Sequence, residues 1–334
     1  MKKRLFAILT VAMLAIGSLY GCTTVEETNG ETTKVVLNEV AHSIFYAPMY
    51  VAIEEDYFAE EGIDVELVTG FGADKTMTAV LSGEADIGFM GSEASIYTYN
   101  EGATDYVVNF AQLTQRAGNF LVAREEMPNF KWEDLKGTYV LGGRKGGMPQ
   151  MVFEYILKEH GIDPKAELEI NQNIDFGSTG AAFTDSDADY TVEFEPHATS
   201  LEQEGKGYVV ASLGEDSGYV PYTAFCAKQS FIEENEEVIQ GFTNALQKGM
   251  DYVNTHTPEE IAKIIQPQFK ETDLDTIITI ITRYYEQDTW KKDLVFEEES
   301  FELLQDILES AGELEKRAPY EDLVTTTFAK KAVE

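Results

Sequence analysis

The sequence predicts an α/β protein of two lobes, each a β-sheet flanked by helices. Between Lys34 and Ala227, short apolar runs alternate with helical segments, a pattern that favours layered and largely parallel sheets. Beyond Ala227 the apolar residues follow helical periodicity only. The chain has 334 residues, which at roughly 150 residues per domain suggests about two domains.

The first residues have the order of a bacterial export signal. Three basic residues at positions 2–4 precede an uncharged apolar run from Leu5 to Tyr20, which is shorter than the roughly 20 residues of a spanning helix. The run ends in Leu-Tyr-Gly-Cys and resembles a lipobox, in which the cysteine becomes the lipidated N-terminus. We therefore expect a signal peptide over 1–21, lipid on Cys22 and a flexible polar tether over 22–34.

Two alternatives to the interpretation as a lipoprotein stay open. One is an uncleaved signal anchor, and the other is a secretory signal with a chance cysteine. Tyr20 is bulkier than the small residue usual at its position in a lipobox. Lipid on Cys22 would exclude an intrachain disulfide, because Cys226 is the second of two cysteines. Cys226 is then predicted to be a small buried apolar residue, and the alternative is a catalytic thiol. An extracytoplasmic protein, anchored to the cell membrane by lipid alone, is the resulting expectation.

The charge balance excludes several classes of partner. Asp and Glu number 60 and Lys and Arg number 25, so the net charge is −35. Nucleic-acid binders neutralise phosphates with clustered basic residues, and a basic face is also what attaches a protein to anionic lipid. Hydrophobic residues at 43% and aromatics at 11% supply a packed core, so the chain is not disordered as a whole. Removing the three basic residues of the signal peptide leaves 22 − 60 = −38, which favours a solvated acidic coat.

Ten runs have strand character and are separated by helical segments. In chain order they are VVLNEV (35–40), DVELV (64–68), DIGFM (86–90), YVVNFAQL (106–113), NFLVAR (119–124), TYVLGG (138–143), ELEI (167–170), DYTVEF (189–194), GYVVASL (207–213) and YTAFCAK (222–228). Two of them, near Leu121–Arg124 and Val220–Phe225, bracket a stretch with strand-helix alternation of its own. We expect the chain to cross there between a discontinuous first lobe, 35–122 plus 224–334, and an inserted second lobe, 123–223.

Helices are predicted for the rest of the chain from apolar stripes at 3.6-residue spacing. One stripe extends from Val238 to Val253, one from Leu274 to Tyr285 and one from Phe301 to Ala311. Residues 257–260, Thr-Pro-Glu-Glu, form a capping box with proline at the first helical position. These stripes are core, and we assign them no chemistry.

Several segments resemble one known family, the solute-binding proteins related to thiamine-pyrimidine synthase. The opening segment is NEVAHSIFYAPMYVAIEEDYFAEEGID (38–64), with Asp56 in place of the usual glycine. Further matches are a glycine pair at 70 and 72, LSGEADIGFMG (81–91), DLKG (134–137), EFEP (193–196) and FIEENEEVIQGFTNAL (231–246). The resemblance implies a type II periplasmic-binding-protein-like fold with a ligand cleft between the lobes. It implies a monomer without cofactor that serves an ABC permease and its ATPase.

The family's ligands are small organic molecules and oxyanions. The resemblance implies a relative of the formylaminopyrimidine-, alkanesulfonate-, taurine- or nitrate-binding proteins. In α/β sheets, ligands bind beyond the carboxyl ends of strands, where loops lead into helices. Three such junctions and one strand supply candidate contacts in this sequence.

The first two junctions combine polar and aromatic residues. After VVL, Asn38 and His42 offer hydrogen bonds, and Phe45 and Tyr46 could stack on a planar ligand. For His42 the alternative is a histidine that caps the loop. After DIGFM, the sequence Gly91-Ser92-Glu93 starts a helix whose backbone N–H groups could meet a ligand acceptor. There the alternative is that Ser92 simply caps the helix.

The third junction, GGRKGGMP at 142–149, is glycine-rich and basic. Glycines allow close approach to a ligand, so Arg144, Gly146 and Met148 are candidate contacts. It is not a P-loop, because Met148 stands where the phosphate-binding lysine would be. Arg144 and Lys145 form a rare basic pair in an acidic chain. One of them could face an anionic ligand group; the alternative is a surface pair that balances acidic neighbours.

The strand DYTVEF and the residues after it supply the remaining candidates. Asp185, Asp187 and Asp189 imitate an EF-hand opening, but Tyr190 replaces its glycine and Pro196 its bidentate glutamate, so no metal site is expected. Alternation puts Glu193 and Glu195 on one side of the strand. In relatives that bind aminopyrimidines, a glutamate here accepts hydrogen bonds from the amino group. Tyr190, Glu193 and Glu195 are therefore candidate contacts.

The predicted function is capture of a small planar, donor-bearing solute, best described as a pyrimidine-type vitamin precursor, and its delivery to an ABC importer. One alternative is a sulfonate or other small anion bound by Arg144. A distant alternative is an enzyme like the pyrimidine synthases, which the single cysteine of the mature body and the absence of HExxH and GxSxG motifs disfavour. The third alternative is a sensory ectodomain, which would need a membrane span and a signalling segment after it. The sequence has no second candidate membrane span.

Overall fold

A computed structural model describes residues 32–175 and 177–334. The residues from Thr32 onward form one compact unit. The predicted signal peptide, Cys22 and most of the predicted tether lie outside the described residues. No helix in the described part of the chain combines the length and the apolar character needed to cross a membrane.

Ten strands form in the part of the chain that the structure describes, one at each of the ten predicted runs. They are β1 (Thr33–Glu39), β2 (Ile63–Thr69), β3 (Ile87–Gly91), β4 (Val107–Thr114), β5 (Asn119–Ala123), β6 (Tyr139–Leu141), β7 (Glu169–Asn171), β8 (Tyr190–Phe194), β9 (Tyr208–Ser212) and β10 (Thr223–Lys228). The first sheet has the order β2-β1-β3-β10-β4, and the second has the order β7-β6-β8-β5-β9. β1 begins inside the segment expected to be tether.

The expectation of largely parallel sheets is wrong for half of the strand pairs. β1 pairs in parallel with β2 and β3, and β6 with β7 and β8. β10 is antiparallel to β3 and β4, and β5 is antiparallel to β8 and β9. Both β5 and β10 enter their sheet from the other one. Parallel neighbours in a sheet are joined by a crossover connection, usually a helix. No such connection within a single sheet leads into β5 or β10 in the described chain.

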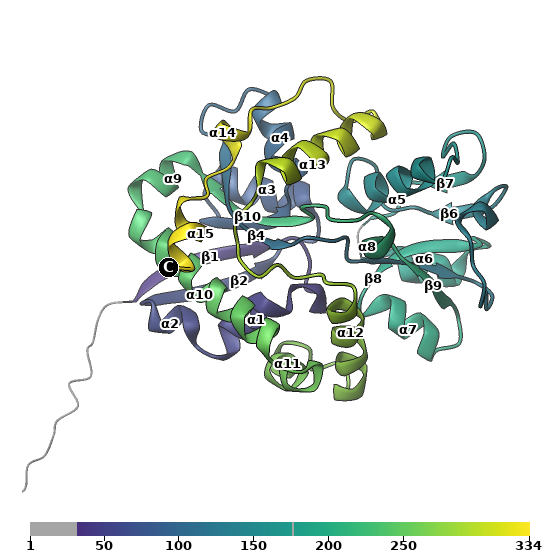
Figure 1. The fold of residues 1–334 in the computed structure, drawn as a ribbon, viewed down its shortest axis with the longest axis horizontal. Helices are drawn as coiled ribbons and strands as arrows, with labels where there is room; N and C mark the ends of the chain where they lie inside the picture. Colours follow the sequence, from purple (N-terminus) through teal and green to yellow (C-terminus); the bar gives the residue numbers. More distant parts are fainter. Residues whose placement is uncertain (1–31, 176) are drawn as a thin grey trace, which may run out of the picture. The chain divides into compact units, whose positions relative to one another are not determined.

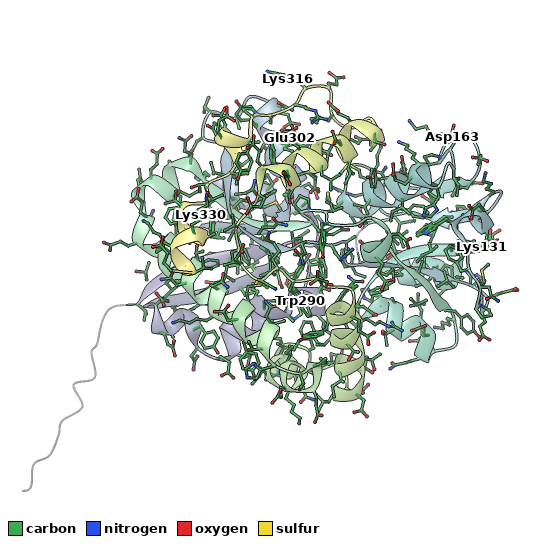
Figure 2. All side chains as sticks on the ribbon, viewed as in Figure 1. Lys131, Asp163, Trp290, Glu302, Lys316 and Lys330 are labelled. Carbon is green, nitrogen blue, oxygen red and sulfur yellow. The ribbon has the colours of Figure 1, made fainter. Side chains whose placement is uncertain are left out.

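The chain passes from the first sheet to the second between Thr114 and Asn119, earlier than the crossing expected at Leu121–Arg124. It returns between Ser212 and Thr223. The first crossing is fixed by residues far along the chain, since Gln115 donates its N–H to the Thr289 carbonyl at 2.9 Å. Beside it, the indole N–H of Trp290 (labelled in Figure 2) donates to the Phe45 carbonyl at 2.9 Å.

Helices cover both sheets, as Figure 1 shows. The helices up to the second crossing are α1 (Ala47–Glu54), α2 (Tyr57–Glu60), α3 (Ala73–Ser82), α4 (Glu93–Asn100), α5 (Met148–Glu159), α6 (Thr179–Asp185), α7 (His197–Gln203) and α8 (Leu213–Asp216). Those after it are α9 (Gln229–Glu234), α10 (Glu236–Thr255), α11 (Pro258–Ile265), α12 (Leu274–Glu286), α13 (Glu298–Ala311), α14 (Tyr320–Leu323) and α15 (Thr327–Ala332). Short 3₁₀ turns lie at Ile44–Tyr46, Trp132–Leu135 and Gln266–Gln268.

The predicted helical stripes are confirmed as core, except that Tyr285 at the end of the second stripe is exposed. α10 buries its apolar face and lies beside α1 (Figure 1), so closely that a Cβ on Gly249 would collide with the Pro48 carbonyl. Thr257 forms the predicted capping box with Glu260 at the start of α11. Cys226 is buried as a free thiol, and burial raises its pKa to about 12, as expected of a small apolar filler and not of a nucleophile.

Candidate functional site

Two cavities lie between residues of the first sheet's loops and residues of the second sheet's loops. The larger, about 360 Å³, is lined by residues of α3, α4 and the start of α5, and we call it the aromatic cavity. The smaller, about 260 Å³, is lined by the end of β8 and the loop after α11, and we call it the carboxylate cavity. Arg144, Pro149 and Phe194 line both, so the two cavities adjoin.

Glu93 is the most unusual group in the aromatic cavity. It is the first residue of α4, two positions after the end of β3, and only 2% of it is exposed. Its Oε2 has no hydrogen-bond partner among the described residues. A Cβ on Gly91 would collide with the Glu93 carboxyl group, so the glycine at the end of β3 makes room for this side chain.

Burial determines the protonation state of Glu93. It raises the pKa of this carboxyl to about 8, although hydrogen bonds from the backbone of Glu93 and Met148 and the charge of Arg144 act in the opposite direction. At neutral pH the group is therefore mainly a neutral acid. A neutral carboxyl group can donate one hydrogen bond and accept others, so Glu93 can form a paired contact with a ligand that presents both a donor and an acceptor.

Aromatic side chains form the walls of the same cavity. Tyr46, Tyr97 and Tyr222 line it together with Met77 and Phe194. Tyr222 donates its hydroxyl to Asn119 Oδ1 at 2.5 Å, and Tyr97 donates to the Gly146 carbonyl at 3.3 Å. Flat aromatic faces around a buried acid suit a planar solute that carries a few polar groups.

Both cations of the glycine-rich junction are paired with acidic residues of the first sheet's helices and loops. Arg144 Nη2 lies 3.1 Å from Asp74 Oδ1, and Lys145 Nζ lies 3.6 Å from Glu313 Oε1. The Asp74 pair belongs to the aromatic cavity, since both residues line it. Because the Arg144 and Asp74 side chains are 42% and 51% exposed, this pair is accessible to solvent and ions.

Glu193 lines the carboxylate cavity, and its carboxyl oxygens are bound within the protein. It accepts hydrogen bonds from the hydroxyls of Thr179 at 2.8 Å and Thr191 at 2.7 Å. Burial raises the pKa of Glu193 to about 7, and the two threonine hydroxyls partly offset that effect. Near neutral pH this carboxyl group is thus close to half ionised.

Glu195 has still more partners. Its carboxylate accepts hydrogen bonds from the Thr199 N–H and hydroxyl, both at 2.8 Å, and from Arg283 Nη1 at 2.8 Å. Arg283, on α12, also pairs with Glu202 on α7 at 2.5 Å. Burial raises the pKa of Glu195 despite these contacts. Its side chain connects α12 to the segment after β8 and has little capacity left for a ligand.

His42 also lines the carboxylate cavity, and both ring nitrogens have protein partners. Nδ1 lies 2.8 Å from Glu39 Oε1, and Nε2 lies 3.0 Å from the Gln268 carbonyl. Burial acts to lower the pKa of His42, but these two hydrogen bonds outweigh it, so the pKa is raised. The contacts favour the loop-capping interpretation of His42.

The structure brings most of the predicted contacts to the two cavities. Tyr46, Gly91, Glu93, Gly146 and Met148 line the aromatic cavity, His42, Glu193 and Glu195 line the carboxylate cavity, and Arg144 lines both. Asn38 and Phe45 line neither. Asn38 accepts a hydrogen bond from the Thr76 hydroxyl at 2.8 Å, and Phe45 is fully buried among core aromatic rings.

Ser92 and Tyr190 likewise lie outside both cavities, and we leave them out of the proposed contacts with Asn38 and Phe45. The Ser92 hydroxyl donates to the Pro221 carbonyl at 2.5 Å, so it makes no helix-capping bond either. Tyr190 is the first residue of β8, away from the strand's carboxyl end, and its hydroxyl contacts the sulfur of Met127 at 3.1 Å.

Several cavity residues were not predicted from the sequence, among them Tyr97, Asn119 and Tyr222. Tyr97 lies on α4 one turn beyond Glu93, a spacing that could have indicated it. Asn119 and Tyr222 are 103 positions apart and meet because β5 and β10 start from the two crossings. No local pattern contains that information.

Comparisons with known proteins agree with this architecture. The sequence model of the family described as NMT1/THI5 like matches residues 44–261. A protein of Bacillus subtilis (strain 168) named "Putative binding protein YtlA" is 49% identical over 299 residues, 90% of each chain. A formylaminopyrimidine-binding protein of Halalkalibacterium halodurans is 24% identical over 274 residues, 80% of each chain.

A solved structure matches over nearly the same extent. The alkanesulfonate-binding protein SsuA of Xanthomonas axonopodis pv. citri, bound to MOPS, superposes with a TM-score of 0.72 at 13% identity, covering 89% of this chain and 100% of that one. Periplasmic binding proteins are among the other matching structures. The two helix-flanked sheets are therefore the periplasmic binding protein fold, as predicted.

Proposed function

This chain belongs to the NMT1/THI5-like family and has the fold of ligand-binding components of ABC import systems, and on that premise we propose that it is the solute-binding component of an ABC importer. The family predicted from segments 38–64 and 81–91 together is thereby confirmed. The proposed solute is small, planar and donor-bearing, and a pyrimidine-type vitamin precursor fits best. The protein would deliver it to a permease without chemical change.

The neutral acid of Glu93 is the observation that carries the ligand class. An aminopyrimidine presents a ring nitrogen beside an amino group, that is, an acceptor next to a donor. A protonated carboxyl group presents the complementary pair. Tyr46, Tyr97 and Tyr222 would stack on or surround the ring. The formylaminopyrimidine-binding relative supports the same class.

The arrangement of sheets supports capture by closure. We infer that the two proposed lobes, each built around one of the sheets, move about the two crossings and enclose the ligand, with β5 belonging to the inserted lobe. Residues of both lobes line both cavities, and the Ser43 hydroxyl already donates to the Glu195 carbonyl at 2.8 Å across them. Lipid on Cys22 and the tether would keep a monomeric receptor outside the membrane and beside its permease.

A second candidate ligand is a small anion such as a sulfonate. Arg144 lines both cavities, and it is the one basic side chain among the described residues that line the aromatic cavity. The solved alkanesulfonate-binding structure shows that this fold accommodates such ligands. In this chain, however, Arg144 already has Asp74 as its partner.

Calorimetric titration with two solute classes tests the proposal. The probes are an aminopyrimidine bearing a hydroxymethyl group, its formylated amine analogue, methanesulfonate and nitrate. We expect the aminopyrimidines to bind and Glu93→Met, which removes both the donor and the acceptor, to weaken them by roughly 10- to 100-fold. Glu93→Gln keeps a donor beside an acceptor and should bind them nearly as wild type does. Glu193→Met is the matched control, because this buried carboxyl is already bonded by two threonines.

Binding of sulfonate or nitrate alone would contradict the pyrimidine class and leave the solute-binding role in place. Equal weakening by Glu93→Met and Glu193→Met would remove Glu93 from its proposed role. Turnover of any probe would contradict the transport proposal as a whole.

A further inference from the structure

The aromatic cavity contains one acidic side chain whose position is unexplained by ligand contact or by the core. Asp74 lies in the first turn of α3 and lines the cavity, and its carboxylate lies 3.1 Å from Arg144 Nη2. Glu101 lines the same cavity. With Glu93 neutral, Asp74 and Glu101 outnumber the single guanidinium, so the cavity carries no net positive charge.

Without Asp74 this cavity would suit an anion. It would combine a guanidinium, which binds sulfonates and carboxylates through paired N–H groups, with the glycine-rich segment before α5. With Asp74 in place, an entering anion must either displace a carboxylate from Arg144 or lie beside a like charge. Specificity commonly depends on such repulsive groups as well as on attractive ones.

Given the proposed function, on which this inference rests, we propose that Asp74 is a specificity-determining residue that occupies Arg144 and thereby excludes small anions from the aromatic cavity. The pair joins α3 to the segment before α5, so it also forms across the two proposed lobes. A pair this exposed adds little to folding stability. Its removal is therefore a test of selectivity with little effect on the fold.

The chain contains a matched control one residue away. Lys145 pairs with Glu313 at 3.6 Å across the same two parts of the molecule, but neither residue lines the aromatic cavity. Glu313→Gln thus removes one acidic charge and one such ion pair without freeing a cation inside the cavity. Asp74→Asn removes the same charge inside it.

The experiment is calorimetric titration of methanesulfonate and nitrate into wild type, Asp74→Asn, Glu313→Gln and the double variant Asp74→Asn with Arg144→Met, at low ionic strength. We expect Asp74→Asn to bind methanesulfonate about tenfold or more tightly than wild type does. Glu313→Gln should match wild type, and the double variant should lose the gain. Thermal unfolding of each variant verifies that it is folded.

Two results would overturn the inference. One is a folded Asp74→Asn whose sulfonate affinity rises no more than that of Glu313→Gln, and the other is a gain that persists without Arg144. Titration of wild type with the aminopyrimidines tests the proposed ligand class and not the role of Asp74. If they do not bind but Asp74→Asn still gains sulfonate affinity through Arg144, the proposed ligand class fails and the role of Asp74 stands.

Discussion

Both cavities contain buried glutamates, yet Glu93 in the aromatic cavity and Glu195 in the carboxylate cavity differ in how many hydrogen-bond partners the protein supplies. Glu195 receives hydrogen bonds from Thr199 and Arg283, whereas Glu93 keeps one oxygen without a partner among the described residues. Burial raises the pKa of both. A buried carboxyl group is therefore a candidate ligand contact when its hydrogen-bonding capacity is unfilled, and a structural group when it is filled.

The largest effect that tests this comparison is the pH dependence of folding stability, measured for wild type and for Glu93→Gln. In the unfolded chain this carboxyl ionises near its ordinary pKa of 4.5, and in the folded protein near 8. Between these values the unfolded state binds fewer protons, so the wild type loses stability as pH rises. We expect wild type to lose roughly 4 kcal/mol relative to Glu93→Gln from pH 4.5 to 8, with no further change above that.

Urea unfolding of ligand-free protein at several pH values measures this difference. Glu193→Gln is the control. Its stability relative to wild type should stop rising near pH 7, where the folded Glu193 ionises. A difference between wild type and Glu93→Gln that is constant with pH would mean that Glu93 has a partner and ionises normally. The contrast with Glu195 would then disappear.

A second test removes Arg283, the cation that is bound to the Glu195 carboxylate. In Arg283→Met, the buried Glu195 and the half-buried Glu202 lose their shared cation. An uncompensated buried charge is costly, so we expect the free energy of unfolding to fall by about 2–3 kcal/mol. Arg317→Met is the control, because Arg317 pairs with Glu302, Asp306 and Glu309 on the surface, where ion pairs stabilise little. Equal losses in the two variants would show that Glu195 is not held by Arg283.

The strands were predictable because each is a short apolar run between polar turns. The run at 106–113 became β4, and the stripe from Val238 to Val253 became the buried face of α10. The direction of β5 and β10 was not predictable. It depends on where the chain crosses between sheets, and the crossing at 115–118 is fixed by contacts with residues near Thr289.

The candidate site was predictable only in part, for a related reason. Sequence position indicated the junctions that contain Glu93, Arg144 and Glu193, since loops after strands supply ligand contacts. It could not show that Glu193 is bonded to two threonines or that Arg144 is paired with Asp74. Thr191 lies on the same strand as Glu193, but Thr179 and Asp74 come from other elements, and whether a side chain is free or occupied is a tertiary property.

The smallest expected effect tests whether the two cavities act as one site. Tyr222 lines the aromatic cavity, and its hydroxyl is bonded to Asn119, which lines the carboxylate cavity. Tyr222→Phe leaves the buried Asn119 oxygen without that donor, and we expect a loss of about 1–2 kcal/mol in the free energy of unfolding. Asn119→Ala should remove most of the effect of Tyr222→Phe, because the hydroxyl then has no acceptor. A double-mutant cycle measures this coupling, and additive losses would mean that the two cavities are independent despite their shared walls.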